Sequence, residues 1–348
     1  MRSKTWVISF LALVLIPLIL FAACTYILDP LLHYRAESPP LTYYTYQDTY
    51  SNPGIAKHYQ YDTVLVGTSM IENTLVDECE EAFDCSMVRL SYAGGSAYDI
   101  RSVLDLCFAS DNEIKTVYWN LDEHQLRANP AETRYPQPSY LYRNDHREDL
   151  SYLLNLDIFY NYTLPNIQQT LAGNVQPAAR RGETFTANYA AATALKYYTR
   201  PDPAQVPFPD TYYMDNTLQN LSDNILPFVE NNPDTEFVFF FVPYSMLYWD
   251  NEVRGGTFDA SMRSLETAIE SLIFYPNVRI YFFHDQWDIV TDLNNYKDYS
   301  HYATWVNSYM TQAIAKDEER ITAENYAAVL EDMRSFVTGY DFESLFLQ

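Results

Sequence analysis

The chain has 348 residues, of which 48% are hydrophobic, and its formal net charge is −24. A chain of this length and hydrophobicity can bury a sizeable core, and no low-complexity linker divides it. The negative charge disfavours nucleic-acid binding, because it repels phosphate backbones, and it equally disfavours docking on anionic lipid through charge. The 32 tyrosines can stack on sugar rings, but tyrosine is also common in strands and at half-buried positions.

The first element is an uncharged apolar run, Trp6–Leu28, which is long enough to cross about 30 Å of hydrocarbon as a helix. Arg2 and Lys4 precede this run. The positive-inside rule therefore predicts a cytoplasmic N-terminus and places the rest of the chain outside the cell membrane. We expect residues 1–28 to be an uncleaved anchor, because the run is longer than the apolar region of a signal peptide.

Two alternatives to the uncleaved anchor remain open at this point. A signal peptidase could cleave after Ala23, or the chain could be a lipoprotein attached through Cys24. Phe21 stands where a lipobox usually has Leu, so the lipoprotein is the less favoured alternative. A stalk is expected over residues 29–60, which are polar and aromatic and include a Pro-Pro pair.

Alternating strand and helix patterns fill the expected globular domain, residues 61–348. Short, largely apolar runs predict strands at 62–67, 86–90, 115–121, 236–242 and 278–283. Helical patterns are expected from about 74 and over 97–109, 217–230, 261–272, 302–315 and 323–336. This alternation predicts an α/β fold with a doubly wound parallel sheet.

The segment between the third and fourth predicted strands, residues 123–235, is too long for a single crossover. It combines helical patterns over 150–171 and 188–198 with Pro-rich loops. We interpret it as a mainly helical insertion over the C-terminal edge of the sheet, where ligands bind in open α/β folds. The insertion would then shape access of the substrate.

Ser69 follows the first predicted strand directly and precedes a helix, in the sequence Gly67-Thr-Ser69. A serine at such a turn directs its hydroxyl into the crevice at the strand ends, with its own N–H near a helix N-terminus. The alternative is an ordinary helix-capping serine, which occupies the same place in many α/β proteins.

A second motif, Asp298-Tyr-Ser-His301, follows the last predicted strand at the expected start of a helix. Its spacing lets Asp298 accept a hydrogen bond from one ring nitrogen and leaves the other free as a base. A serine nucleophile needs such a base. The alternative is a capping Asp beside a surface His, but His301 is the only one of the six histidines with an Asp three residues before it.

The order of these motifs resembles that of the SGNH/GDSL hydrolase superfamily over roughly 62–121 and 236–316. Gly67-Thr-Ser69 is similar to its nucleophile block, Gly94-Gly95 to its glycine block and Asp298-Tyr-Ser-His301 to its final block. The resemblance implies a flavodoxin-like three-layer fold without cofactor or metal. It also implies an oxyanion hole made by Ser69, Gly94 or Gly95, and Asn120.

The third block departs from the family pattern, because Trp119-Asn120-Leu121-Asp122 stands where Gly-x-Asn-Asp is usual. Asn120 could lie inside the strand, in which case Asp122 or His124 would take its place at the site. Similar departures occur in membrane-anchored members that modify cell-surface polymers, such as alginate O-acetyltransferases and the D-alanyl transfer protein of teichoic acids. The chain resembles that branch most.

Further residues follow predicted strands and could line the same pocket. Tyr244 and Ser245 follow the fourth strand and His284 follows the fifth, although a plain turn and a satisfied loop histidine are the simpler interpretations. Cys79 and Cys85 could pair outside the cell. The absence of a CxxC motif argues against a structural zinc site.

The sequence therefore predicts an extracytoplasmic serine esterase or O-acyltransferase that acts on polysaccharide through an acyl-serine intermediate. Its expected partners are a glycan or acylated polymer and, for transfer, a membrane-bound O-acyltransferase as donor. The alternative is a protein of the same fold that binds glycan and catalyses nothing.

Overall fold

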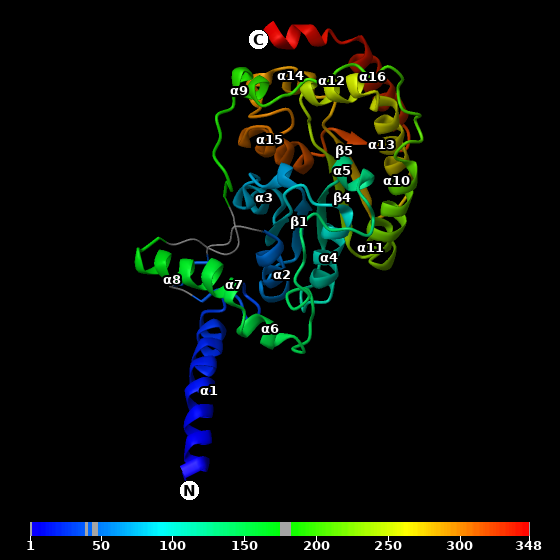
Figure 1. The fold of residues 1–348 in the computed structure, drawn as a ribbon. Helices are drawn as coiled ribbons and strands as arrows, with labels where there is room; N and C mark the ends of the chain where they lie inside the picture. The colour runs from blue at the N-terminus through cyan, green and yellow to red at the C-terminus, as the bar shows by residue number, and fades with distance from the viewer. Residues whose placement is uncertain (1, 39–40, 44–47, 175–181, 348) are drawn as a thin grey trace. The chain divides into compact units, whose positions relative to one another are not determined.

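The structure is a computed structural model and describes residues 2–38, 41–43, 48–174 and 182–347 (Figure 1). The chain forms two compact units. Unit 1 comprises Met1–Tyr59, Val103–Asp111 and Pro136–Ala179, and unit 2 comprises Gln60–Ser102, Asn112–Tyr135 and Arg180–Gln348. The segment 123–235 is thus divided between the two units, and the predicted boundaries after residues 28 and 60 stay predictions.

Unit 2 is built on a six-stranded sheet in the order β2-β1-β3-β4-β5-β6. All neighbouring strands are parallel except β5 and β6, which are antiparallel. The five predicted strands are confirmed to within one or two residues, whereas the two-residue β6 was not predicted. The bounds are β1 (Thr63–Gly67), β2 (Met87–Ser91), β3 (Thr116–Asn120), β4 (Glu236–Phe241), β5 (Val278–Phe282) and β6 (Arg320–Ile321).

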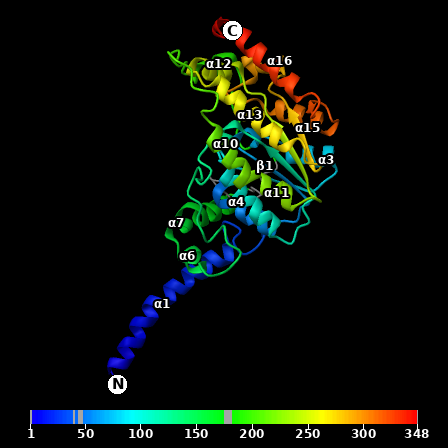
Figure 2. The same ribbon diagram turned by 90° about the vertical axis from the view of Figure 1, so that its right-hand side faces the viewer.

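Helices cover both faces of this sheet, and this explains why its central strands are apolar along their whole length. α3 packs against α15 on one face, and α10, α11 and α13 lie on the other (Figures 1 and 2). The helices of unit 2 are α3 (Val76–Phe83), α5 (Glu123–Arg127), α9 (Ala191–Lys196), α10 (Met214–Asn220), α11 (Leu226–Asn231), α12 (Met246–Gly255), α13 (Phe258–Leu272), α14 (Trp287–Val290), α15 (Thr304–Ala315) and α16 (Tyr326–Gly339); α4 (Ala97–Phe108) begins in this unit. Short 3-10 or π-helical turns are η1 (Ser69–Ile71), η3 (Leu221–Ile225), η4 (Leu293–Asn295) and η5 (Phe342–Leu347).

Unit 1 contains the N-terminal helix α1 (Arg2–Leu28), in which Lys4–Leu28 is long and apolar enough to cross a membrane. Its other elements are α2 (Asp48–His58), α6 (Asp149–Leu153), α7 (Leu156–Ile158), the π-helical turn η2 (Phe159–Thr163) and α8 (Leu164–Leu171). Helix α2 lies within the segment predicted as a stalk, and most of its residues are buried. Gly54 permits this packing, because a Cβ there would lie 2.5 Å from that of Leu32.

The strand order places a crevice at the C-terminal ends of β1 and β3. The chain leaves β1 toward β2 on one side and later continues from β3 to β4 on the other, so the order reverses at this point. Ligands bind in doubly wound sheets where the order reverses in this way. Ser69 follows β1 and Asp122 follows β3, so both lie at this edge.

We expect Gly67→Ala to destabilise the protein, because Gly67 touches the neighbouring strand. An added Cβ would lie 2.7 Å from the Cβ of Asn120, which is closer than real Cβ contacts. Overpacking of this kind costs about 1–3 kcal/mol, to be measured by urea unfolding in detergent micelles. Gly339→Ala is the matched control, because nothing lies within 4 Å of its Cβ position. Equal stability of the two variants would contradict the prediction.

Candidate active site

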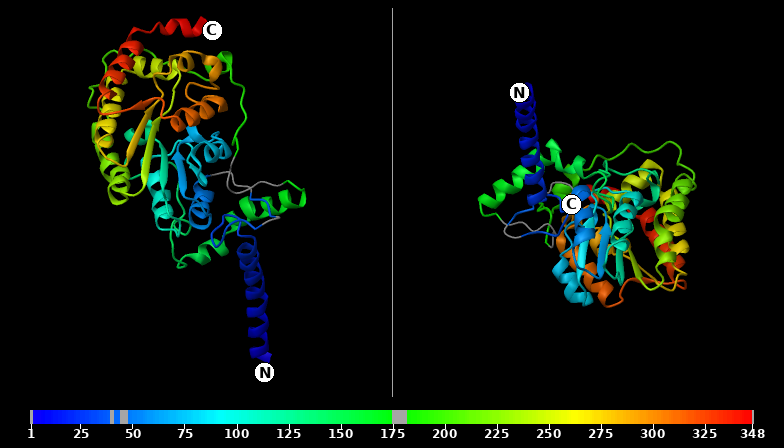
Figure 3. Two further views of the ribbon diagram at one scale, coloured as in Figure 1. Left: turned by 180° about the vertical axis from the view of Figure 1, so that it is seen from behind. Right: turned by 90° about the horizontal axis from the view of Figure 1, so that it is seen from below.

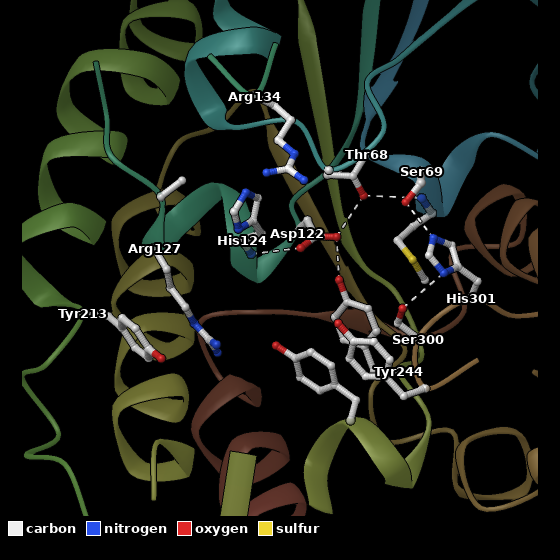
Figure 4. A pocket seen from close by; sticks show the side chains of 15 residues that line it. Thr68, Ser69, Asp122, His124, Arg127, Arg134, Tyr213, Tyr244, Ser300 and His301 are labelled. Atoms are coloured by element: carbon white, nitrogen blue, oxygen red, sulfur yellow. Dashed lines mark hydrogen bonds between the residues drawn. The ribbon is translucent and has the colours of Figure 1, made fainter. Parts of the chain in front are cut away.

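The Ser69 turn is held by the residue that precedes it. Thr68 has an extended backbone and caps η1, whose first residue is Ser69. The backbone N–H of Thr68 donates to Oδ1 of Asn120 at 3.4 Å, and its hydroxyl donates to Oδ2 of Asp122 at 2.9 Å. Thr68 therefore fixes the turn through β3, and Ser69 lies at the pocket wall with its hydroxyl toward His301 (Figure 4).

The structure brings Ser69, His301 and Asp298 together in one hydrogen-bonded series. The Ser69 Oγ lies 2.8 Å from Nε2 of His301, and Nδ1 of His301 lies 2.8 Å from Oδ2 of Asp298. Since a carboxylate only accepts, Nδ1 carries the proton and Nε2 can accept from the serine hydroxyl. This is the arrangement in which an imidazole can act as a base toward a serine.

The segment carrying Asp298 and His301 is a turn that precedes α15, rather than the predicted first turn of a helix. Oδ1 of Asp298 accepts the backbone N–H groups of Ser300 at 2.9 Å and His301 at 2.8 Å. The next residue, Tyr302, is buried and donates its hydroxyl to the carbonyl of Met70 at 2.9 Å. This bond ties the histidine turn to the residue that follows Ser69.

The Asp298 carboxylate stays ionised over the neutral range. Burial by itself would raise its pKa, but the hydrogen bond and charge of His301 and the two backbone N–H groups lower the pKa to about 2. An ionised carboxylate beside Nδ1 stabilises the imidazolium that forms when His301 takes a proton.

A pocket of about 580 Å³ opens beside Ser69 in unit 2. One side carries the reactive groups, and another carries the tyrosines Tyr244, Tyr248 and Tyr299 (Figure 4). The ring of Tyr248 stacks on Tyr244 with 4.2 Å between centroids and lies nearly parallel to Tyr299 at 6.1 Å. The lining comprises Thr68, Ser69, Met70, Gly94, Asp122, His124, Arg127, Ala128, Arg134, Tyr213, Tyr244, Tyr248, Tyr299, Ser300 and His301.

The three further residues predicted for the oxyanion hole are placed differently. Gly94 lines the pocket in the left-handed conformation, with φ of 62°. The N–H of Gly95 instead donates to the carbonyl of Tyr92 at 2.8 Å. Asn120 is fully buried within β3 and does not line the pocket. Its side chain supports the Ser69 turn through Thr68, and its role at an oxyanion stays a prediction.

Asp122 and His124, the alternatives to Asn120, both line the pocket. Asp122 is buried and accepts hydrogen bonds from the hydroxyls of Thr68, at 2.9 Å, and Tyr244, at 2.5 Å. Its other oxygen accepts the backbone N–H of His124 at 2.9 Å. Asp122 thus connects the serine turn to the tyrosine side of the pocket.

Ser245 and His284 lie behind the pocket wall. Ser245 is buried, caps α12 through the N–H of Leu247, and donates to the carbonyl of Tyr299 at 2.6 Å. The ring of His284 is buried against that of Tyr244, with 5.5 Å between centroids, and burial lowers its pKa to about 3. Both support tyrosines that line the pocket.

Sequence reasoning missed several lining residues, some of which carried a signal. Tyr248 lies in the first turn of α12, four residues after Tyr244, and Tyr299 and Ser300 lie inside the Asp-x-x-His motif. Arg134 comes from a loop whose course no local pattern indicates.

A buried ionic group of Glu123, Arg127 and Glu252 lies next to the tyrosines. Arg127 bonds both carboxylates, and the Tyr248 hydroxyl donates to Glu123 at 2.8 Å. Burial raises the pKa of Glu123 to about 7, with a further rise from Glu252, although Arg127 opposes the shift.

We expect Glu123→Gln to stabilise the protein more at about pH 8 than at about pH 5. The unfolded chain releases the Glu123 proton near the ordinary glutamate value of 4.5, whereas the folded chain retains it to about 7. The free energy of unfolding of the wild type therefore falls across this window, and glutamine removes that contribution. Urea unfolding at both pH values measures it, with exposed Glu81→Gln as control. An equal effect of Glu123→Gln at both values would contradict the assignment.

Metal ligands and disulfide bonds are the remaining features to place. Within the described residues, no group of three His, Cys, Asp or Glu side chains could hold a metal ion. Cys79 and Cys85, both of which the structure describes, are not joined in a disulfide. The considered pairing of Cys79 with Cys85 is therefore not formed.

The comparisons with known proteins add little to this geometry. No protein-family model and no curated protein matches the chain. A solved structure from Streptococcus pneumonia, provisionally described as a platelet activating factor, matches 78% of this chain and 90% of its own, with 10% identity and a TM-score of 0.40. A likeness this low establishes neither a shared fold nor a shared activity.

Proposed function

We propose that this chain is a membrane-anchored serine esterase or O-acyltransferase of the SGNH type that acts on polysaccharide. The observation that carries the proposal is the series from Ser69 Oγ through His301 to Asp298, with both hydrogen bonds at 2.8 Å. Its position at the edge where β1 and β3 end supports the same reading. The strand order 2-1-3-4-5 is that of flavodoxin-like doubly wound sheets, as the SGNH fold requires.

The proposed reaction passes through an acyl-serine intermediate. Ser69 Oγ attacks the ester carbonyl carbon while Nε2 of His301 takes the hydroxyl proton, and Asp298 stabilises the resulting imidazolium. The backbone N–H groups of Ser69 and Gly94 are the proposed donors to the tetrahedral oxyanion. Collapse breaks the ester C–O bond, and His301 returns the proton to the leaving alcohol.

The acceptor decides between hydrolysis and transfer in the second half of the reaction. His301 removes a proton from water or from a sugar hydroxyl, the acceptor oxygen attacks the acyl-serine, and Ser69 regains its proton. Tyr299 favours a sugar acceptor, because its ring is 40% exposed at the pocket. For transfer, a membrane-bound O-acyltransferase is the proposed source of the acyl group.

Anchoring by α1 is part of the proposal. The helix continues through Cys24 to Leu28, as an uncleaved anchor requires, and Arg2 and Lys4 at its start favour a cytoplasmic N-terminus. Unit 2 would then work outside the cell membrane. A lipoprotein attached through Cys24 remains the less favoured arrangement.

One observation favours the alternative of a glycan-binding protein without catalysis. Asn120 does not line the pocket, so the amide donor that the family resemblance implies is missing from it. The tyrosine side of the pocket would serve sugar binding equally well in such a protein.

Labelling of the full chain in lipid nanodiscs with a fluorophosphonate probe separates the two candidates. The proposal expects one covalent adduct, mapped by mass spectrometry to Ser69, and turnover of p-nitrophenyl acetate. Absence of both adduct and turnover would leave the glycan-binding alternative.

A further inference from the structure

An apolar stripe runs along the surface of the helical segment Leu156–Leu171 of unit 1. This segment is continuous through α7, η2 and α8. Its apolar side chains recur at steps of three or four residues, which places them on one face. Leu156 and Tyr160 are each 61% exposed and Leu171 is 83% exposed, while Leu164 and Ile167 are half-buried.

A different face of the same segment packs against the rest of unit 1. Ile158 and Tyr162 are buried in a cluster with Leu31, Leu141 and Tyr152. The exposed stripe is therefore additional to the face that folding requires. Leu150 on helix α6 of the same unit is a further exposed apolar side chain, at 70% exposed.

The segment lies against α1 at the depth where a membrane interface is expected. The rings of Phe21 and Phe159 contact each other with 5.0 Å between centroids. Trp6 and Tyr26, twenty residues apart, lie about 30 Å apart along the helix, which is the thickness of the hydrocarbon core. Aromatic residues of this kind favour the two membrane interfaces.

Phe21 is five residues from Tyr26, which marks the outer end of the span of about 30 Å between Trp6 and Tyr26. The contact of Phe21 with Phe159 therefore lies about 7 Å inside that outer end. This is the depth at which the apolar face of an interfacial helix is buried, about 5–10 Å. Within unit 1, α8 runs across the axis of α1 rather than along it (Figures 1 and 3). A helix so oriented can lie in the plane of the membrane surface.

We propose that Leu156–Leu171 lies in the interface of the membrane that α1 spans, with its apolar stripe toward the acyl chains. The inference rests on the proposed anchoring by α1. The occupant is lipid because the segment contacts, through Phe159, a helix that would itself be in lipid. The segment carries Asp157 and no Lys or Arg, so its binding is apolar and independent of anionic lipid.

The test places an environment-sensitive fluorophore on single cysteines of the full chain in phosphatidylcholine nanodiscs. Cys24→Ala and Cys85→Ser remove the two half-buried thiols. Tyr160→Cys and Ile167→Cys report on the stripe. Asn161→Cys and Gln168→Cys are the adjacent controls, since both are polar residues that are not part of the stripe. Leu13→Cys, at a 75% exposed position in α1, reports on the anchor itself.

We expect shallow nitroxide-labelled lipids to quench the stripe positions at least about twofold more than their neighbours, and aqueous iodide to show the reverse order. Adding anionic phosphatidylglycerol should leave this pattern unchanged. If iodide quenches the stripe positions while deep nitroxides quench Leu13→Cys, the inference is overturned and the anchor stands. The stripe would then be a contact surface for another membrane protein. An unquenched Leu13→Cys would overturn the anchoring and the inference together.

Discussion

Ser69→Ala is expected to abolish fluorophosphonate labelling and to lower kcat for p-nitrophenyl acetate by about 10⁴-fold or more. The substitution removes the atom that forms the acyl bond, and within the pocket lining no other hydroxyl is hydrogen-bonded to Nε2 of His301. Stability should change little, because the Ser69 side chain is at the pocket wall. Probe labelling and turnover of the full chain in nanodiscs measure the effect.

The control is Ser245→Ala, a second serine that follows a strand of the same sheet. Its hydroxyl caps α12 and lies behind the pocket, so its loss should cost about 1 kcal/mol of stability and leave labelling intact. If labelling survives in Ser69→Ala and disappears in Ser245→Ala, the assignment of Ser69 as the nucleophile is wrong.

The pattern of apolar residues was sufficient to predict the strands of the sheet but not helix α2 of unit 1. The run Glu236–Val242 predicted β4 because helices cover both faces of that strand. Side chains that point to either face are therefore buried, and every residue after Glu236 is apolar. Helix α2 carried the opposite signal, since Pro53 and Gly54 are turn residues. Its helix is stabilised by burial against Leu31 and Leu32, which no local pattern shows.

The site divides in the same way between local and non-local information. The Asp298–His301 spacing is local, and the sequence predicted that the aspartate reaches the ring. Whether Asn120 ends β3 or lies inside it depends on another strand: the N–H of Leu121 donates to the carbonyl of Phe240, which carries the ladder past Asn120. Asn120 therefore lies within the sheet rather than beyond its edge.

Asp298→Asn is expected to lower kcat by about 10²–10⁴-fold, a loss smaller than that of Ser69→Ala. Oδ1 of Asp298 accepts two backbone N–H groups, so the asparagine carbonyl must take that position to keep the turn. Its NH₂ group then faces Nδ1 of His301, where Oδ2 stands in the wild type. Nδ1 becomes an acceptor, and Nε2 carries the proton and can no longer remove one from Ser69.

The asparagine variant also loses the carboxylate that, with its pKa of about 2, stays ionised beside the imidazolium. The nucleophile itself is intact, so slow fluorophosphonate labelling should persist above the Ser69→Ala background. Labelling rates of the three proteins, measured beside their urea unfolding, separate a chemical effect from loss of the turn. If Asp298→Asn labels at the wild-type rate while folded, Asp298 does not set the tautomer; if it is as inactive as Ser69→Ala, its part in forming the acyl-serine is larger than orientation.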